Sequence, residues 1–479
     1  MNLSRAGALL YSSRLLGKVV TFLGIVYFAN MIGAAAMGMF FLFQASLGIL
    51  SIPADFGVRG AVEKRISEGT EAADRLLATG IALKVIPLVL ISAALLALRG
   101  EVNEYVGGAV TVVIVASLFV REAALLAENV LRGELRVGET ASLEVIRDVS
   151  WVASSVLLVW TGLEALALVY GWLIGHFLMA LAGWYLMDTG IGKPAAGLVQ
   201  SLFNYGKYRF VLEAGSKVFG WIDVAVLGFL VTQEAVGAYE VAWRVGEAVI
   251  LVSSTIAKTI FPQISAWKSE NRTEEISRVL RQALTATMVL AVPAVLGTVV
   301  LVEEILELVF GTEYGVAALA LVVLMGQKLV QSVYNVFGYA LQAIDRPDLS
   351  AAATVVSIAM NIGLNVVLIF RFGLVGAALA TTIAYVVNTA LHVFFLHDEV
   401  PIAVAHRDLL WIVTAALTMA AVVAATKATF AVTTRSALAG AVALGVVVYG
   451  CVLLLSHSLR TQIRGNLGWI LGDDGSTDS

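Results

Sequence analysis

The sequence predicts an all-α polytopic membrane protein. Of its 479 residues, 59% are hydrophobic and 14% are charged, whereas a soluble domain has about 25% charged residues. Apolar stretches of about twenty residues, the length that crosses a bilayer as a helix, follow one another with short loops. Glycine and proline also recur at matched positions in the two halves of the chain. These three observations predict about fourteen transmembrane helices, arranged as two six-helix lobes in parallel repeat plus two C-terminal helices.

Each predicted span is an apolar run between polar or glycine-rich loops. The first run contains Arg14 and Lys18 and is too long and too polar for a cleavable signal sequence, so we interpret it as a retained span. The predicted spans are, in order, Leu9 to Met31, Met37 to Phe56, Leu77 to Leu98, Tyr105 to Ala127, Ser142 to Trp160, Leu166 to Met187, Phe210 to Val231, Val236 to Phe261, Ala283 to Val302, Val316 to Leu341, Leu349 to Phe370, Leu374 to Leu396, Leu409 to Ala425 and Ala437 to Leu455.

Basic residues predict the orientation of the chain. With the N-terminus in the cytoplasm, eighteen lysine and arginine residues of the loops fall inside, and only Arg99, Arg371, Lys427 and Arg435 fall outside. The positive-inside rule therefore predicts that both termini are cytoplasmic. We expect a multi-pass protein of the cell membrane.

Matched glycine and proline positions predict the internal repeat. Gly38 and Gly237 open the second and eighth spans 199 residues apart, and Pro87 and Pro293 interrupt the third and ninth spans 206 residues apart. Because six spans are an even number, both halves begin on the same side, so the repeats are parallel. We expect an N-terminal lobe at residues 1–200, a C-terminal lobe at residues 201–397, and two additional helices with a short cytoplasmic tail at residues 398–479.

Charged residues inside the predicted spans are the candidate functional groups. A charge at the bilayer centre costs about 2.5 to 3.5 kcal/mol, so such residues face the protein interior, pair with one another, or serve function. The candidates are Arg14, Lys18, Asp55, Lys84, Arg121, Glu122, Glu128, Glu144, Arg147, Asp148, His176, Glu213, Lys217, Asp223, Glu240, Arg244, Glu247 and Lys328.

Some of these residues have an oppositely charged neighbour on the same helical face. Lys217 lies four residues after Glu213, and Arg244 lies between Glu240 and Glu247 at helical spacing. Glu144 likewise precedes Arg147 by three residues. We interpret these residues as neutralised pairs that stiffen helix contacts. His176, alone on an apolar helix, is either a packed residue or a group that titrates near neutrality.

Four cations have no carboxylate within one helical turn. Arg14 and Lys18 share one face of the first span, and Lys84 and Lys328 lie roughly 10 Å and 18 Å into their spans. Carboxylates on other helices are one way to neutralise them. The other interpretation is that they bind an anion, and several cations between two bundles suit a phosphate or pyrophosphate group.

The second interpretation predicts a cavity that binds the phosphate of a substrate. Its cationic residues are Arg14, Lys18, Lys84, Lys328, Lys217 and Arg244. The acidic residues beside them are members of ion pairs or take a coupling proton or sodium ion, and these are Asp55, Glu122, Asp223, Glu213 and Glu247. We therefore expect no cofactor, and a cycle that draws on an H⁺ or Na⁺ gradient.

Several other classes of function are excluded by the sequence. The chain has one cysteine, Cys451, so an intrachain disulfide framework and a cysteine metal cluster are excluded. It has no Walker A sequence and no paired histidines at metal-ligand spacing. The net charge of -4 gives no indication of nucleic-acid binding. We expect neither a catalytic site nor a metal site.

A series of short motifs carries a resemblance to a known family. They are Ile32-Gly33 with Met37-Gly38-Met39-Phe40, Ala54-Asp55-Phe56-Gly57-Val58-Arg59, Asp223 to Gly228, Val236-Gly237-Ala238-Tyr239 with Ala242-Trp243-Arg244, Phe261-Pro262-Gln263-Ile264-Ser265, Phe310 to Tyr314, Asn361 to Asn365 and Phe372 to Ala378. From about residue 5 to residue 400, the chain resembles the polysaccharide exporter or O-antigen flippase family, which is Wzx-like. That family lies in the MOP superfamily with the MATE exporters and the lipid II flippase MurJ.

The resemblance implies a MATE/MurJ-like fold and a flippase. Such a protein moves an oligosaccharide linked to undecaprenyl or dolichyl phosphate across the cytoplasmic membrane by alternating access, for synthesis of a surface polysaccharide or a glycoprotein glycan. Its partners are the lipid-linked glycan, membrane lipids and glycan polymerases or glycosyltransferases.

Two other functions are weighed against a flippase. A MATE-like, ion-coupled exporter of small cations requires an acidic cavity, which unpaired lysines argue against. A membrane glycan polymerase or glycosyltransferase requires catalytic groups on a sizeable external loop, and the external segments here are short.

Overall fold

The structure is a computed structural model that describes the backbone of residues 3–69 and 72–461, and side chains from residue 16 onward except at 208, 209, 211, 212 and 252. Within those ranges the chain is helical and has no strand. The α-helices are α1 (Leu3–Asp55), α2 (Val58–Glu68), α3 (Ala73–Ala97), α4 (Arg99–Val106), α5 (Thr111–Gly133), α6 (Val137–Val159), α7 (Ala165–Leu186), α8 (Ala196–Leu230), α9 (Gln233–Ser269), α10 (Thr273–Val300), α11 (Val302–Glu304), α12 (Ala318–Ala343), α13 (Pro347–His397), α14 (His406–Thr429) and α15 (Arg435–Leu454). A π-helical turn (Ile305–Phe310) and a 3₁₀ turn (Thr312–Ala317) join α11 to α12.

The predicted spans coincide with helices. Two very long helices each hold two spans, because α1 is broken at Gly33 (φ 78°) and α13 at Gly373 (φ 54°). Positive φ is the conformation that glycine adopts at little cost, so these residues separate the first span from the second and the eleventh from the twelfth. The predicted all-α membrane fold is confirmed.

The number of spans depends on how charged helices are treated. By length and apolar composition, nine helices of the described residues are able to cross a membrane, or ten if the bent pair α4 and α5 is one span. Helices α6 and α8 have at least three charged residues in every window of eighteen, and α1 and α13 each count once. The count of about fourteen therefore stays a prediction.

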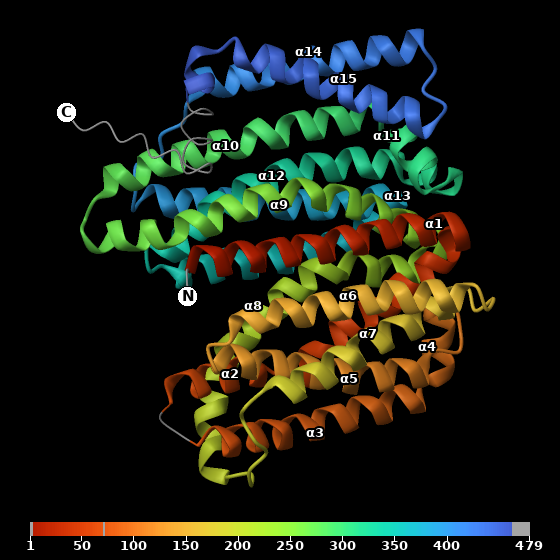
Figure 1. Cartoon of the computed structure of the whole chain (residues 1–479), viewed down its shortest axis with the longest axis vertical. Helices are drawn as coiled ribbons and strands as arrows, with labels where there is room; N and C mark the ends of the chain where they lie inside the picture. Colours follow the sequence, from red (N-terminus) through yellow and green to blue (C-terminus); the bar gives the residue numbers. More distant parts are fainter. Residues whose placement is uncertain (1–2, 70–71, 462–479) are drawn as a thin grey trace. The chain divides into compact units, whose positions relative to one another are not determined.

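The chain divides into two compact units (Figure 1). The first unit contains residues 1–241 and 362–377, and the second contains residues 242–361 and 378–479. In the first unit α7 packs against α5 and α6, and in the second α14 packs between α10 and α15. The predicted lobe boundaries at residues 200 and 397 concern the sequence repeat, which this division does not test.

Two turns occupy matching positions in the two predicted halves. The turn between α5 and α6 and the turn between α12 and α13 lie 210 residues apart. Leu135 in the first and Asp345 in the second have left-handed φ values of 61° and 66°. The next residues, Arg136 and Arg346, each donate the backbone N–H to the carbonyl oxygen five residues earlier, at 2.9 Å and 3.2 Å. These two turns agree with the predicted repeat, although Asn271 and Arg272 form the same turn elsewhere, so the repeat stays a prediction.

The two arginines also make equivalent contacts. Arg136 Nη1 donates to the carbonyl oxygen of Leu186 at the end of α7 (2.6 Å), and Arg346 Nη1 donates to Glu399 Oε1 just after α13 (2.5 Å). Lys268 at the end of α9 also donates to Glu399, at 3.1 Å. These two hydrogen bonds, from Lys268 and Arg346, lower the pKa of Glu399. Each arginine thus joins an interhelical turn to the end of a helix in its own unit, α7 for Arg136 and α13 for Arg346.

A pair of glycines brings two repeat-related helices into backbone contact within the first unit. A Cβ atom on Gly38 of α1 would lie 1.8 Å from the carbonyl oxygen of Gln233, and one on Gly237 of α9 would lie 2.1 Å from that of Ala34. Gly38 and Gly237 are 199 residues apart, and so are Ala34 and Gln233, so the contact is symmetric. Only glycine fits at either position, which explains why the same residue opens both spans.

Candidate functional site

A buried ion network occupies the first unit. Lys84 of α3 donates from Nζ to Asp55 Oδ1 at the end of α1 (2.8 Å) and to Glu122 Oε2 of α5 (2.7 Å). The exposed fractions of these residues are 3%, 2% and 2%. Three helices therefore contribute one charge each to a contact that is closed to solvent.

Arg59 extends this network to α2 and α8. Its Nε lies 2.9 Å from Asp55 Oδ1 and 3.8 Å from Glu122 Oε2, and its Nη2 lies 3.5 Å from Glu213 Oε2. Gly57 (φ 77°) forms the turn that separates α1 from α2. This turn places Arg59 beside the carboxylate of Asp55, four residues before it. The sequence analysis did not include Arg59 in the site. Its position four residues after Asp55 was the sequence feature that could have identified it as a member of the site.

Lys84 and Lys328 both have acidic partners, and these lie on other helices rather than within one helical turn. In the second unit, Lys328 is fully buried, and its Nζ donates to Glu247 Oε1 at 2.7 Å. The same ammonium lies 3.5 Å from the centroid of the Trp243 ring, a cation–π contact. Both lysines are neutralised by carboxylates of other helices, the alternative that the sequence left open. A search within one helical turn missed these carboxylates because they are 29 to 81 residues away in the chain.

The remaining predicted cations are held by weaker partners or lie at the surface. Lys217 of α8 is half-buried and donates from Nζ to Ser51 Oγ at 2.9 Å. It lines a small pocket with Asp55 and Glu213. Lys18 is exposed and Arg244 of α9 is half-buried. The side chain of Arg14 lies outside the described residues.

Two further candidates hydrogen-bond beyond their predicted neighbours. Arg121 Nη1 donates to the carbonyl oxygen of Leu47 (3.0 Å) and lies 3.9 Å from Glu122 Oε1. Arg147 Nε donates to the adjacent Asp148 Oδ1 at 2.8 Å. Arg121 thus contacts a backbone carbonyl of another helix and an adjacent acid, Arg147 pairs with an adjacent acid, and the pairing predicted at i, i+3 and i, i+4 stays a prediction.

Asp223 lies in a second buried network of the first unit. Tyr239 donates its hydroxyl to Asp223 Oδ2 (2.8 Å), and Asn365 donates Nδ2 to Oδ1 (2.7 Å). The exposed fraction of Asp223 is 4%. Tyr239 and Asn365 both lie in motifs that carried the family resemblance, but the sequence analysis gave neither a role.

His176 is a packed residue. Its ring stacks on that of Trp172 with centroids 3.6 Å apart, and its Nδ1 lies 3.0 Å from the Trp172 carbonyl oxygen. Of the two interpretations of His176, the structure supports packing. No group of three metal-ligating side chains occurs among the described residues.

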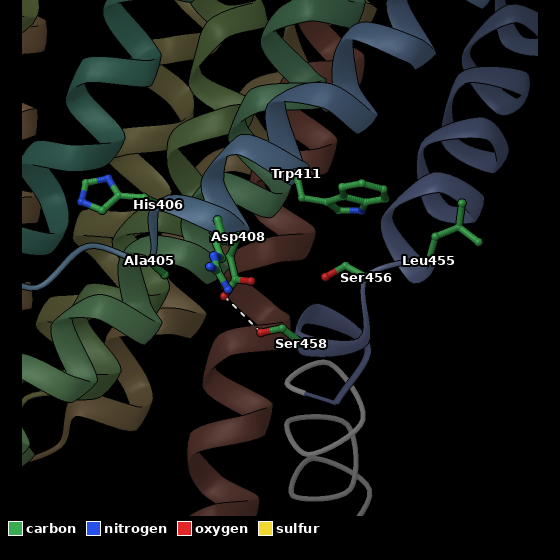
Figure 2. Close-up of a pocket in the computed structure, with 8 residues that line it drawn as sticks. Ala405, His406, Asp408, Trp411, Leu455, Ser456 and Ser458 are labelled. Atoms are coloured by element: carbon green, nitrogen blue, oxygen red, sulfur yellow. Dashed lines mark hydrogen bonds between the residues drawn. The ribbon is translucent and has the colours of Figure 1, made fainter.

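A wider pocket lies between the start of α14 and the segment after α15 (Figure 2). Its volume is about 770 Å³, and its lining includes Arg407, Asp408 and Trp411. Ser458 donates to Asp408 Oδ2 at 3.3 Å across the pocket. None of these residues was a predicted site residue. The pocket holds both signs of charge, which gives it no preference for an anionic substrate.

Comparison with known proteins identifies the family. The profile of the family described as "Polysaccharide biosynthesis protein" matches residues 27–319. The chain belongs to this family. It is 42% identical over 467 residues to the probable low-salt glycan biosynthesis flippase Agl15 of Haloferax volcanii, covering 98% of this chain and 99% of that protein. It is 32% identical over 398 residues to the probable flippase AglR of the same organism, covering 82% and 83%.

Solved structures of this fold include two transporters. The lipid II flippase MurJ in an inward closed conformation superimposes with a TM-score of 0.79 at 15% identity, covering 94% of this chain and 98% of MurJ. An inward-facing MATE multidrug transporter of the MOP superfamily gives a TM-score of 0.65 at 15% identity, covering 80% and 94%. The family member described here therefore has the MATE/MurJ-like fold that the sequence predicted.

Proposed function

We propose that this protein is a flippase that translocates a lipid-linked oligosaccharide across the membrane by alternating access. The observation that carries the proposal is the 42% identity to a probable glycan biosynthesis flippase over 98% of the chain. The buried ion networks agree with it, because charge is expensive in a membrane helix unless it serves a polar pathway or pairs. The protein is a transporter rather than an enzyme.

The phosphate of the carrier lipid binds at Lys217 rather than at Lys84 or Lys328. Those two lysines are buried and hydrogen-bonded to carboxylates, so an anion would have to displace a bound carboxylate at each. Lys217 donates to a neutral hydroxyl and is only half-buried. A phosphate oxygen would add an opposite charge to the ammonium of Lys217, which a serine hydroxyl does not supply. Lys18 and Arg14 stay proposed members of the same site, and Arg244 stays a proposed phosphate ligand of the second unit.

Ion coupling, where it occurs, belongs to Asp223 and not to the acids that hold Lys84. Asp223 is buried between a tyrosine hydroxyl and an asparagine amide, both of which are neutral groups. Asp55, Glu122, Glu213 and Glu247 each lie within 3.5 Å of an arginine or lysine nitrogen. We propose that these four serve as ion-pair members, and that Asp223, buried and hydrogen-bonded to Tyr239 and Asn365, is the group for an H⁺ or Na⁺ gradient.

The protein acts in the cytoplasmic membrane with both termini inside. The excess of basic residues on one set of loops supports this orientation. The proposed partners are the lipid-linked glycan, the surrounding membrane lipids, and the glycosyltransferases or polymerases that make and use the glycan.

Reconstitution tests the function directly. Proteoliposomes are loaded with a polyprenyl-phosphate-linked sugar, and exposure of the sugar in the opposite leaflet is followed with a membrane-impermeant lectin. We expect exposure in minutes with the protein and none in empty liposomes. Equal exposure in both would refute the proposal. A free cationic dye moved by the same vesicles would indicate an exporter instead.

A further inference from the structure

Lys84 lies between two carboxylates that retain acceptor atoms. Its ammonium takes one oxygen from each acid, Asp55 Oδ1 and Glu122 Oε2. The other oxygens, Asp55 Oδ2 and Glu122 Oε1, are buried and accept no hydrogen bond from the described part of the chain. Two carboxylate oxygens thus contact one monovalent ammonium, and the second oxygen of each acid has spare lone pairs.

We propose that Asp55 and Glu122 form a binding site for a monovalent metal cation whose occupant in this protein is the tethered ammonium of Lys84. Carboxylate oxygens are the ligands that hard cations prefer. The ammonium occupies the position that such an ion would take, at 2.7 to 2.8 Å from both acids. The site lies inside the first unit, where all three residues are almost fully buried.

The charge balance selects a monovalent occupant. Asp55, Glu122 and Glu213 together carry -3, and Lys84, Arg59 and Arg121 together carry +3, so the contact set is neutral. Without the ammonium the set carries -1, and an uncompensated buried charge is strongly unfavourable. A sodium-sized ion restores neutrality, whereas a divalent ion would leave +1.

A tethered cation differs from a free one in its response to ion gradients. Lys84 remains on α3 at any sodium concentration, so the site stays filled throughout a transport cycle. A sodium gradient therefore has nothing to act on at this position. The inference goes beyond the proposed function, because it concerns which cation fills a buried site and not what the protein moves.

The test replaces the ammonium by an apolar group of similar length. The full-length protein in detergent is unfolded thermally in sodium chloride and in choline chloride at equal ionic strength, for wild type, Lys84→Met, Lys84→Arg and Lys84→Met with Asp55→Asn. A ligand that binds only the folded state raises the Tm. We expect Lys84→Met to gain a sodium-dependent Tm increase of about 3 °C or more.

The other variants are matched controls. Lys84→Arg keeps a tethered cation and should respond to sodium as wild type does, and adding Asp55→Asn to Lys84→Met should remove the gained response. The inference is overturned if Lys84→Met shows no more sodium response than wild type, or if the double variant keeps the gain. Neither measurement involves transport, so a failed flippase assay leaves this result unaffected.

If Lys84→Met does not fold in either salt, the wild-type protein is used to test the inference instead. Asp55→Asn is then made in the otherwise native protein, and its Tm is measured in the two salts. With the ammonium already in the site, the sodium response of Asp55→Asn should equal that of wild type. A sodium-dependent stabilisation of wild type that Asp55→Asn abolishes would overturn the inference, because the site would then be open to free ions.

Discussion

The glycine contact between α1 and α9 makes a sharp stability prediction. A methyl group at Gly38 would lie 1.8 Å from the Gln233 carbonyl oxygen, and Cβ contacts below 3.0 Å are essentially never found. The two backbones must therefore separate by roughly 1.2 Å, and no flexible side chain is present to absorb the shift. Overpacking of this kind costs about 1 to 3 kcal/mol or more. We expect Gly38→Ala to lower the Tm by about 1 to 3 °C, because the unfolding entropy of a 479-residue chain is about 1 kcal/mol/K.

The assay is thermal unfolding of the purified protein in detergent, with a second glycine as control. Gly363 is an exposed helical glycine with no atom within 4 Å of its ideal Cβ, so Gly363→Ala should be neutral or stabilise by about 0.4 to 1 kcal/mol. Because Gly38 and Gly237 share one contact, their double alanine variant should lose less than the sum of the two single losses. A Gly38→Ala protein as stable as Gly363→Ala would refute the reasoning.

Three further outcomes follow from the charged residues. Lys217→Ala should abolish leaflet exposure of a lipid-linked sugar at unchanged Tm, whereas Lys64→Ala on the exposed face of α2 should transport normally; equal rates would remove Lys217 from the substrate site. Arg59→Ala leaves buried carboxylates undercompensated and should cost about 3 to 5 kcal/mol, against about 0 to 1 kcal/mol for the more exposed Arg65→Ala, measured by denaturation in detergent; similar losses would contradict the network. The ion pairs of Glu399 lower its pKa, so they stabilise the fold above the ordinary pKa of a glutamate and cease to do so as pH falls through the lowered value. The Tm advantage of wild type over Glu399→Gln should therefore vanish in acid. An advantage that persists in acid would exclude these ion pairs as its source.

The fold was predictable because its signals lie close together in the sequence. An apolar run of twenty residues can be recognised as a span without reference to any other part of the chain. Gly33, Gly38, Gly237 and Gly373 mark helix breaks or close contacts that a local pattern can reveal. The repeat was predictable for the same reason. Recognising it needs only pairs of glycine or proline positions with a nearly constant spacing. Helix boundaries within α1 and α13 follow from those glycines as well.

The partners of the buried charges were not predictable in this way. Lys84 meets Asp55 and Glu122 from two other helices, and Lys328 meets a glutamate 81 residues earlier. Helical periodicity shows which residues share a face of one helix. It does not show which other helix that face contacts. A lysine with no local carboxylate therefore indicates only that its partner is distant or is a ligand. The structure was needed to distinguish these two cases.

The two halves share their scaffold but not their chemistry. Turns such as those at Leu135 and Asp345, and the glycine pair at Gly38 and Gly237, recur at nearly constant spacing. The printed partners of the two buried lysines differ. Lys84 is neutralised by two acids in the first unit, whereas Lys328 in the second contacts Glu247, Gln331 and the indole face of Trp243. The recurring turns and glycine contact give the two halves the same scaffold. A substrate with a charged phosphate at one end and a polar glycan at the other requires different side chains in the two halves. Differences between the halves, rather than their likeness, are therefore the places where substrate selectivity should be sought.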